Sequence, residues 1–349
     1  MKGIAIDCCN RRVIYGCSTI YHVYITVLKA IINLPSVDVD IYLDDFTIPN
    51  VDGLASRIRK SGLFRNVIVL KRKNLLLSIH PYELRRIICR VFVSTFDKQL
   101  GFLRSYDDIY IYNDSDWVAM YATDRHIYYH TIEDGLDCFK LFDECLENTQ
   151  RRPIFKRFMR DFLNFPWAMT ESKYCLDVEI NDAHELATKI DKPLVVVPRT
   201  RLLSNARDHG IEVLFDIFPI PDVSEMNGGV LILTLPNEAF RGPHSFDFDQ
   251  IDFCRRLQKR FYGRRCFIKP HPRDYTDYAA ILSQVVVIPR ELPIEILNLS
   301  NKLKMYAAVS YCSTSTGGIK FSEHLYICKR GMNIHGVDYL DLNDSLETF

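Results

Sequence analysis

Short apolar runs alternate along the chain with amphipathic stretches of helical length. In the first half, this pattern predicts strands at residues 3–8, 37–43, 66–71, 107–114, 126–132 and 192–198. It predicts helices at residues 18–32 and 52–64, and Ser18 or Thr19 is the expected N-cap of the first. Strands that alternate with helices indicate a mainly parallel sheet with both faces covered.

The alternation restarts at Val230, just after the segment 224–229 with its Asn and Gly residues. The second half is predicted to contain strands at residues 230–236, 265–272, 285–289 and 305–312, and helices at residues 251–261, 293–303 and 319–324. We therefore expect an α/β fold with two Rossmann-like domains that face a central cleft. The expected domains are residues 1–225 and 226–349.

The composition narrows the class of protein. The 349 residues are 48% hydrophobic, and 44 Lys and Arg balance 44 Asp and Glu, which argues against a broad nucleic-acid-binding surface. The 11 cysteines form no CxxC pair and no zinc-ligand spacing, which favours reduced thiols in a cytoplasmic protein. No apolar run has the length of a signal peptide or a membrane span, so we expect a soluble protein.

Three short motifs follow predicted strands, the place where open parallel sheets bind ligands. The first is Lys-Pro-His-Pro-Arg at residues 269–273, where two prolines hold His271 on a stiff backbone. The near-neutral pKa of an ordinary histidine allows it to donate a proton or a hydrogen bond to a phosphate. Lys269 and Arg273 add positive charge nearby. A solvated turn is the alternative interpretation.

The second and third motifs offer an anion cradle and a general base. Residues 312–318 read Cys-Ser-Thr-Ser-Thr-Gly-Gly, and their hydroxyls precede the predicted helix 319–324, whose N-terminus would attract a phosphate. An ordinary N-cap is the alternative.

Residues 133–135 read Glu-Asp-Gly after a predicted strand, and paired carboxylates can deprotonate an acceptor hydroxyl. A surface Asp-Gly turn is the commoner role of such a tripeptide.

Taken together, the three motifs resemble those of bacterial sialyltransferases and polysialyltransferases: an acidic Glu/Asp-Asp-Gly, a His-Pro pair and a Ser/Thr-rich stretch. Their order and spacing resemble the lipooligosaccharide sialyltransferase family, glycosyltransferase family 52. The segment 291–297 (ELPIEIL) also resembles that family's Pro-x-Glu stretch. The resemblance is strongest from Val230 to His324 and at the Glu-Asp-Gly turn.

The resemblance implies the two-domain GT-B architecture and an inverting transfer of sialic acid from CMP-sialic acid, with no metal and no cofactor. The implied acceptor is a terminal sugar, galactose in the first place, of a bacterial surface glycan such as lipooligosaccharide or capsule. His271 would bind the CMP phosphate and act as general acid, and Asp134 with Glu133 would deprotonate the acceptor. Glu295 would hold the ribose hydroxyls or the cytosine edge. The other implied donor-binding residues are Lys269, Pro272, Ser313, Thr314, Ser315, Thr316 and Gly317.

The base and the absence of a metal each have a rival interpretation. Asp247 and Asp249, in the loop after the first strand of the second half, compete with Asp134 as the base, although Asp249 is equally well interpreted as the N-cap of the following helix. Residues 114–116, Asp-Ser-Asp, are the best rival for a metal site, and we interpret them as a loop. The Asp-x-Asp of residues 38–40 falls within a predicted strand, so we interpret it as part of the alternating pattern of that strand and not as a metal site.

Rival functions follow from the same motifs. One is a GT-B transferase that uses a UDP- or GDP-hexose for surface polysaccharide synthesis. Another is a nucleotide- or glycan-binding protein without catalysis, against which the intact His-Pro-Arg-Asp segment argues.

The basic and aromatic segment 151–169 allows peripheral contact with the inner face of a bacterial membrane, where a glycolipid acceptor lies. For this segment we favour an amphipathic helix with buried aromatic residues. Separately, the resemblance allows a homodimer, because dimers occur in that family.

Overall fold

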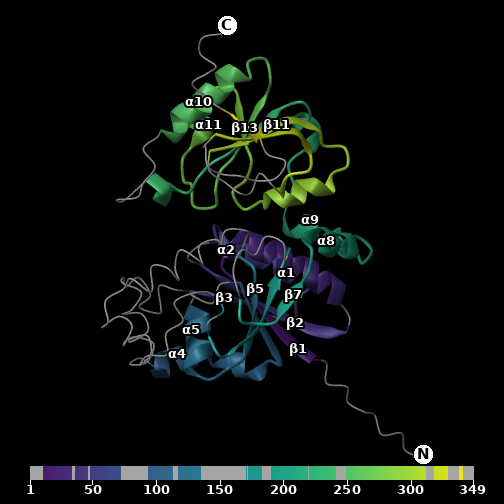
Figure 1. Cartoon of the computed structure of the whole chain (residues 1–349), viewed down its shortest axis with the longest axis vertical. Helices are drawn as coiled ribbons and strands as arrows, with labels where there is room; N and C mark the ends of the chain where they lie inside the picture. Colours follow the sequence, from purple (N-terminus) through teal and green to yellow (C-terminus); the bar gives the residue numbers. More distant parts are fainter. Residues whose placement is uncertain are drawn as a thin grey trace, which may run out of the picture. The chain divides into compact units, whose positions relative to one another are not determined.

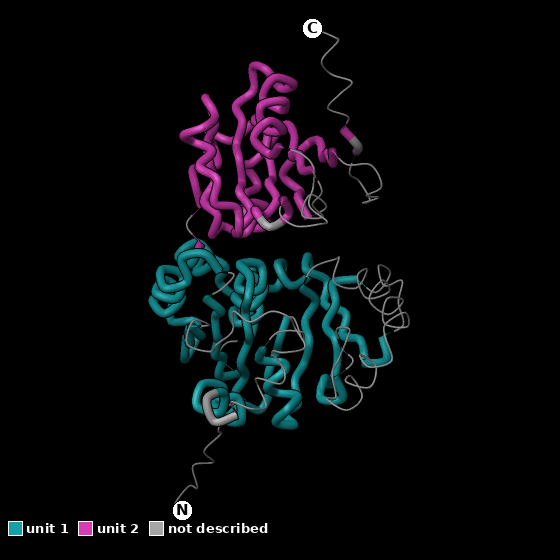
Figure 2. Tube along the Cα trace, turned by 90° about the vertical axis from the view of Figure 1, so that its left-hand side faces the viewer, with its two compact units in different colours: residues 1–217 teal, residues 218–349 magenta. Residues whose placement is uncertain are grey.

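The computed structural model contains two compact units, residues 1–217 and 218–349 (Figure 2). It describes residues 11–33, 36–45, 48–71, 93–112, 117–134, 170, 172–182, 190–218, 220–240, 249–311, 318–328 and 338–340. The domain boundary that the sequence predicts after residue 225 falls inside the second unit, in the short 3-10 helix η4 (Val223–Met226). The strand predicted at residues 3–8 lies outside the described residues.

Unit 1 is built on a seven-stranded sheet in the order β3-β2-β1-β4-β5-β6-β7, and every pairing in it is parallel (Figure 1). Its strands are β1 (Arg11–Cys17), β2 (Val37–Asp44), β3 (Val67–Leu70), β4 (Asp108–Ile111), β5 (Tyr129–Ile132), β6 (Cys175–Ile180) and β7 (Leu194–Val196). Its helices are α1 (Ile20–Asn33), α2 (Val51–Ser61), α4 (Val93–Leu100), η2 (Gly101–Ser105), α5 (Trp117–Asp124), α8 (Arg199–Arg207) and α9 (Val213–Ile217).

The apolar runs of unit 1 form its strands because they can be buried on both faces. β2 shows this clearly, since its last six residues are buried whichever face they point to. β1 also requires a glycine, because a Cβ atom at Gly16 would lie 1.9 Å from the hydroxyl oxygen of the buried Tyr42. The predicted alternation is confirmed for β2 to β5, β7, α1 and α2. The sequence did not predict β1, β6, α4, α5, α8 or α9.

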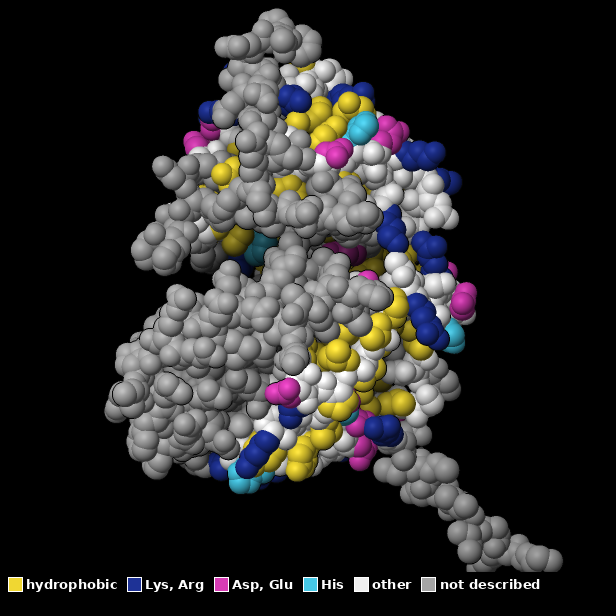
Figure 3. Space-filling model, viewed as in Figure 1, with side chains coloured by type: hydrophobic (Ala, Val, Ile, Leu, Met, Phe, Trp, Pro, Cys, Tyr) yellow, Lys and Arg dark blue, Asp and Glu magenta, His cyan; other side chains and the backbone are white. Residues whose placement is uncertain are grey.

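One edge of this sheet is apolar and exposed. The side chains of Leu194, Val195 and Val196 in the edge strand β7 are 41%, 42% and 48% exposed. Figure 3 shows hydrophobic side chains gathered on this part of unit 1.

Within the described part of the chain, no helix is both long enough and apolar enough to cross a bilayer.

Unit 2 is built on a six-stranded parallel sheet in the order β10-β9-β8-β11-β12-β13 (Figure 1). Its strands are β8 (Val230–Leu233), β9 (Cys266–Lys269), β10 (Val285–Val287), β11 (Met305–Ser310), β12 (Ser322–Ile327) and β13 (Asp338–Tyr339). Its helices are η4, η5 (Asn237–Phe240), α10 (Gln250–Arg260), α11 (Tyr278–Ile281) and η6 (Ile294–Leu299). The unit has its own core, in which Phe253 and Leu257 of α10 pack against β8 and β9.

Two helices predicted in this half are corrected by the structure. Residues 319–324 do not form a helix: the chain is irregular up to Phe321, and Ser322 begins β12, which pairs in parallel with β11. The strand continues through the β-favouring residues Leu325, Tyr326 and Ile327, and its ladder with β11 outweighs the local helical pattern. The helix predicted at residues 293–303 is the shorter 3-10 helix η6.

Candidate functional site

The carboxyl edge of the unit 2 sheet carries the His-Pro motif. Three strands end there in register, because Leu233 pairs with Lys269 of β9 and with Ser310 of β11. Thr234 follows β8 and His271 follows β9, and the backbone N–H of His271 donates to Oγ1 of Thr234 over 3.0 Å. The chain order reverses between β8 and β11, and open α/β sheets bind ligands at such a reversal.

The imidazole of His271 has a fixed tautomer. Its Nδ1 accepts the backbone N–H of Arg273 over 3.1 Å, so the proton of the neutral ring lies on Nε2. Burial, and then the positive charges of Arg273 and Lys269, lower the pKa of His271 to about 4. The near-neutral pKa expected from the sequence is therefore wrong, and His271 is a neutral hydrogen-bond donor. A bound phosphate anion would raise this pKa again because it favours the charged ring.

The loop that holds His271 is tied to the unit by the fully buried carboxylate of Asp274. Its Oδ2 accepts hydrogen bonds from Thr234 Oγ1 at 2.6 Å, Tyr278 OH at 2.8 Å and Gln250 Nε2 at 3.2 Å. These donors come from the end of β8, from α11 and from α10, so three elements converge on one carboxylate. The sequence analysis did not single out Asp274 by itself, although it follows the motif histidine by three residues.

Lys269 and Glu295, both predicted to bind the donor, lie in buried surroundings. Nζ of Lys269 donates to the carbonyl oxygens of Pro270 at 2.8 Å and Arg290 at 3.2 Å. Burial lowers the pKa of Lys269 to about 8, and the negative charges of Glu295 and Glu291 partly oppose that effect. Burial raises the pKa of Glu295, which stands in the first turn of η6.

The remaining predicted donor residues are only partly described. Pro272 is half-buried in the turn after His271. The other five lie outside the described residues: Ser313, Thr314, Ser315, Thr316 and Gly317. Because β11 ends at Ser310 in register with β8, this stretch follows the same sheet edge that carries His271. The helix predicted at residues 319–324, whose N-terminus was expected to complete a phosphate cradle, is not formed, since β12 begins at Ser322.

The acidic motif lies at the carboxyl edge of the unit 1 sheet. Asp134 follows β5, 27% of its side chain is exposed, and its Oδ1 is hydrogen-bonded to Nε2 of His22. His22 stands in the first turn of α1 and is fully buried, and its ring stacks on Tyr112 with the two ring centroids 4.2 Å apart. His22 belongs to none of the three sequence motifs. Its partner is 112 residues away, which no local pattern reveals.

Glu133, the other predicted carboxylate, is buried behind this contact. Its Oε2 accepts the backbone N–H of Asn181 at 2.6 Å, and its own N–H donates to the carbonyl oxygen of Glu179 at 2.9 Å. Glu133 thereby joins β5 to the end of β6. Of the two carboxylates, Asp134 is the one with exposed surface.

A buried ion cluster lies beside these residues. Glu179 of β6 pairs with Lys29 of α1 and with Nη1 of Arg199 of α8, the latter over 2.7 Å. Nε and Nη2 of Arg199 are buried and have no hydrogen-bond partner. Burial lowers the pKa of Lys29, and Glu179 opposes this effect. The cluster links α1, which carries His22, to β6 and α8.

The rival base Asp249 serves as a helix cap. Its Oδ1 accepts the backbone N–H groups of Ile251 at 2.8 Å and Asp252 at 3.2 Å, so it is the N-cap of α10. The capping interpretation offered from the sequence is therefore confirmed. Asp247 lies outside the described residues.

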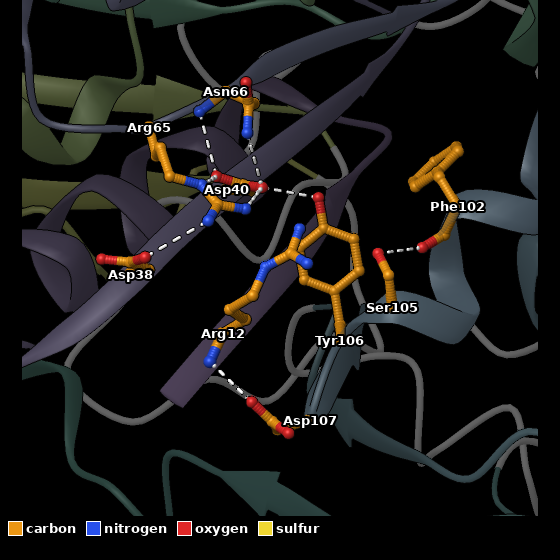
Figure 4. Close-up of polar contacts among 9 residues, drawn as sticks. All are labelled: Arg12, Asp38, Asp40, Arg65, Asn66, Phe102, Ser105, Tyr106 and Asp107. Atoms are coloured by element: carbon orange, nitrogen blue, oxygen red, sulfur yellow. Dashed lines mark hydrogen bonds and ion pairs between the residues drawn. The ribbon is translucent and has the colours of Figure 1, made fainter. Parts of the chain in front are cut away.

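At the opposite, amino edge of the unit 1 sheet, the Asp-x-Asp of residues 38–40 forms ion pairs rather than an open carboxylate pair. Figure 4 shows Asp40 between Arg65, Asn66 and Tyr106; Arg65 Nη2 donates to it at 3.0 Å and Tyr106 OH at 2.5 Å. Burial raises the pKa of Asp40, but these hydrogen bonds outweigh it and the pKa is lowered. Asp38 pairs with Nη1 of Arg65 at 3.2 Å.

In the described part of the chain, no three His, Cys, Asp or Glu side chains are grouped so that they could hold a metal ion. Residues 114–116, the rival metal motif, lie outside that part. Metal independence stays a prediction.

Comparison with known proteins places the chain in a family. The model of glycosyltransferase family 52 matches residues 40–323, which include Asp134 and His271. The chain belongs to glycosyltransferase family 52. It is therefore a glycosyltransferase, as the motifs predicted. No curated protein sequence matches it significantly.

Several solved structures are similar to this family 52 chain. An α/β-galactoside α-2,3-sialyltransferase from Photobacterium phosphoreum is similar over 96% of this chain and 99% of its own, with 12% identity and a TM-score of 0.51. The GT-B domain of a Photobacterium damselae sialyltransferase covers 92% of each chain at 11% identity, with a TM-score of 0.43. A spinosyn forosaminyltransferase covers 95% of this chain and 86% of its own at 12% identity, with a TM-score of 0.49. The likeness to the first structure shows the GT-B type of fold, as predicted.

Proposed function

We propose that this family 52 glycosyltransferase transfers sialic acid from CMP-sialic acid to a terminal sugar, galactose in the first place, of a bacterial surface glycan. The proposed reaction inverts the anomeric carbon and uses neither metal nor cofactor. The observation that carries the proposal is His271, a neutral imidazole with its proton fixed on Nε2 at the ligand-binding edge of the unit 2 sheet.

The donor side fits a leaving group with a single phosphate. Such a group needs fewer countercharges than a diphosphate, and preorganised hydrogen-bond donors can stabilise it without a cation. His271 supplies Nε2–H, and the charges of Lys269 and Arg273 act on the same place. In the proposal the hydroxyls of residues 313–316 add further hydrogen bonds, and Glu295 holds the nucleoside. Residues 319–324 add no helix dipole to this site, because β12 begins at Ser322.

The acceptor side supplies a base. The acceptor hydroxyl gives its proton to the carboxylate of Asp134, and its oxygen forms the new bond to the anomeric carbon of the sugar. The bond from that carbon to the phosphate oxygen breaks, and its electron pair stays on CMP. Nε2–H of His271 hydrogen-bonds the developing phosphate charge.

The proposed acceptor is an oligosaccharide or glycolipid, and the proposed place of action is the cytoplasmic face of the bacterial membrane. The support is the basic and aromatic composition of residues 151–169. Vesicles with anionic lipid should bind the protein more strongly than neutral vesicles in a flotation assay.

A donor panel tests the reaction. CMP-sialic acid, a UDP-hexose and a GDP-hexose are each incubated with the protein and terminal galactosides, with EDTA present throughout. We expect transfer only from CMP-sialic acid. Transfer from a hexose nucleotide instead would support the rival enzyme, and binding of CMP without turnover of any donor would support a non-catalytic protein.

A matched pair of variants tests the base. Asp134→Asn removes the proposed base, and we expect kcat to fall by a factor on the order of 100 or more. Asp249→Asn removes the rival charge but keeps a good N-cap residue for α10, so its stability and kcat should stay close to those of the wild type. The opposite ranking of the two variants would assign the base to Asp249.

A further inference from the structure

His22 makes more specific contacts than a packed histidine needs, and one of them is with the proposed base Asp134. Its ring is fully buried between α1 and the sheet edge, and it lies nearly parallel to Tyr112, with an interplanar angle of 7°. The backbone N–H of Ser18 donates to Nδ1 over 3.2 Å, and Nε2 contacts Asp134. The end of β1, the end of β4 and the end of β5 therefore all hold this one ring.

These contacts place a proton on Nε2 of His22. A carboxylate oxygen can only accept, so Nε2 donates to Oδ1 of Asp134. Nδ1 lies 3.2 Å from both the backbone N–H and the hydroxyl oxygen of Ser18, and this hydroxyl can either donate to Nδ1 or accept from it. Ser18 therefore holds this side of the ring whichever way the proton of Nδ1 is arranged.

The carboxylate of Asp134 needs such a partner. It stands past the last residue of β5, outside the ladder of the sheet, and 27% of its side chain is exposed. A base must be held in one orientation to take a proton from a bound hydroxyl, and a small misplacement lowers the rate steeply. His22 is rigid because its ring is stacked and hydrogen-bonded at both nitrogens, so it transmits that rigidity to the carboxylate.

We propose that His22 is the positioning residue of the acceptor base: its Nε2–H holds one carboxylate oxygen of Asp134 and thereby orients the carboxylate toward the acceptor hydroxyl. This assignment rests on the proposed function, in which Asp134 is the base. The assignment gives a role in the proposed reaction to His22 of α1, which contacts Asp134 of the acidic motif in the folded protein.

Two substitutions separate positioning from packing. His22→Phe keeps a ring that can stack on Tyr112 but removes the donor to Asp134. His22→Gln loses the ring but places an amide N–H near the position of Nε2. We expect kcat to fall by a factor on the order of 100 in the Phe variant and by less than about 10 in the Gln variant, with the KM of the donor within about twofold in both. Thermal melting of both variants accompanies the kinetics.

A double variant provides the decisive comparison. If His22 acts through Asp134, the combination of His22→Phe with Asp134→Asn should be no slower than Asp134→Asn alone. Multiplied losses in the double variant, or an equal loss of kcat in the Phe and Gln variants, would overturn the proposal.

The protonation of Nε2 provides a test that needs no turnover. In the wild-type protein, ¹⁵N NMR of the histidine rings should show a His22 ring with a protonated Nε2, assigned by its loss in His22→Gln. An unprotonated Nε2 would overturn the proposal whatever the activity. The kinetic variants are assayed with whichever donor the wild type turns over, so a different donor overturns the proposed function and leaves the role of His22 still testable.

Discussion

At the scale of single residues, the lowered pKa of His271 makes the stability of the folded protein depend on pH. Burial and two neighbouring cations lower this pKa from 6.5 to about 4. As the pH falls below 6.5, the unfolded chain takes up the proton while the folded ring stays neutral until the pH approaches about 4. His271 therefore contributes stability that is complete above pH 6.5 and is lost as the pH falls through this window.

We expect His271→Gln to lose less stability than the wild type between about pH 7 and about pH 5, because glutamine does not titrate there. Urea denaturation at the two pH values measures the difference. His209→Gln is the control, since His209 is exposed and its replacement should leave the pH dependence unchanged. Equal acid losses in wild type and His271→Gln would contradict the lowered pKa.

At the scale of elements, the loop after β9 depends on a single buried carboxylate. Asp274→Ala leaves the donors of Thr234, Gln250 and Tyr278 without their shared acceptor, so we expect the free energy of unfolding to fall by about 3 kcal/mol. Tyr278→Phe removes only one of the three hydrogen bonds and should cost about 1 kcal/mol. Urea denaturation of the two variants gives both values. Equal costs would mean that Asp274 does not organise the loop.

The elements themselves were predictable to different degrees. Short apolar runs predicted β4, β8 and β9, because such runs are buried on both faces of a parallel sheet, and the alternating residues 37–43 predicted β2. β1 was missed because it begins with Arg11 and Arg12 and contains Gly16, which disguise its apolar centre. β12 was mistaken for a helix because its partner strand β11, and not its local pattern, decides its conformation.

The residues of the candidate site were also predictable to different degrees. His271 and Asp134 were predictable, because each stands in a short motif after a recognisable strand. His22 and Thr234 were not, because each acquires its role from a partner 112 or 37 residues away. The lowered pKa of His271 was also hidden, since it depends on burial that only the folded unit creates.

At the scale of the whole molecule, each unit has a core of its own. One cluster around Phe96, Trp117 and Tyr129 fills unit 1, and another around Phe253 and Ile268 fills unit 2. The chain has two tryptophans, Trp117 and Trp167, and both belong to unit 1. Tryptophan fluorescence therefore reports the unfolding of unit 1, whereas calorimetry reports both units.

We expect CMP to raise the calorimetric transition of unit 2 and to leave the fluorescence transition nearly unchanged, because the proposed phosphate ligands lie in unit 2. At about 100 times its Kd, the nucleotide should add about 2.7 kcal/mol to the stability of the unit that binds it. Cytidine, which lacks the phosphate, is the control and should shift the transition less. Equal shifts in both signals would place the nucleotide contacts in unit 1 as well.

The way in which the imidazole of His271 is held affects how this protein can change over evolutionary time. Its Nδ1 is occupied by the peptide group of Arg273. Every amino acid except proline supplies the same group, so a mutation at position 273 can remove the positive charge there and still leave the proton of the neutral ring on Nε2. Among homologues, proline should be the residue that natural selection keeps out of position 273.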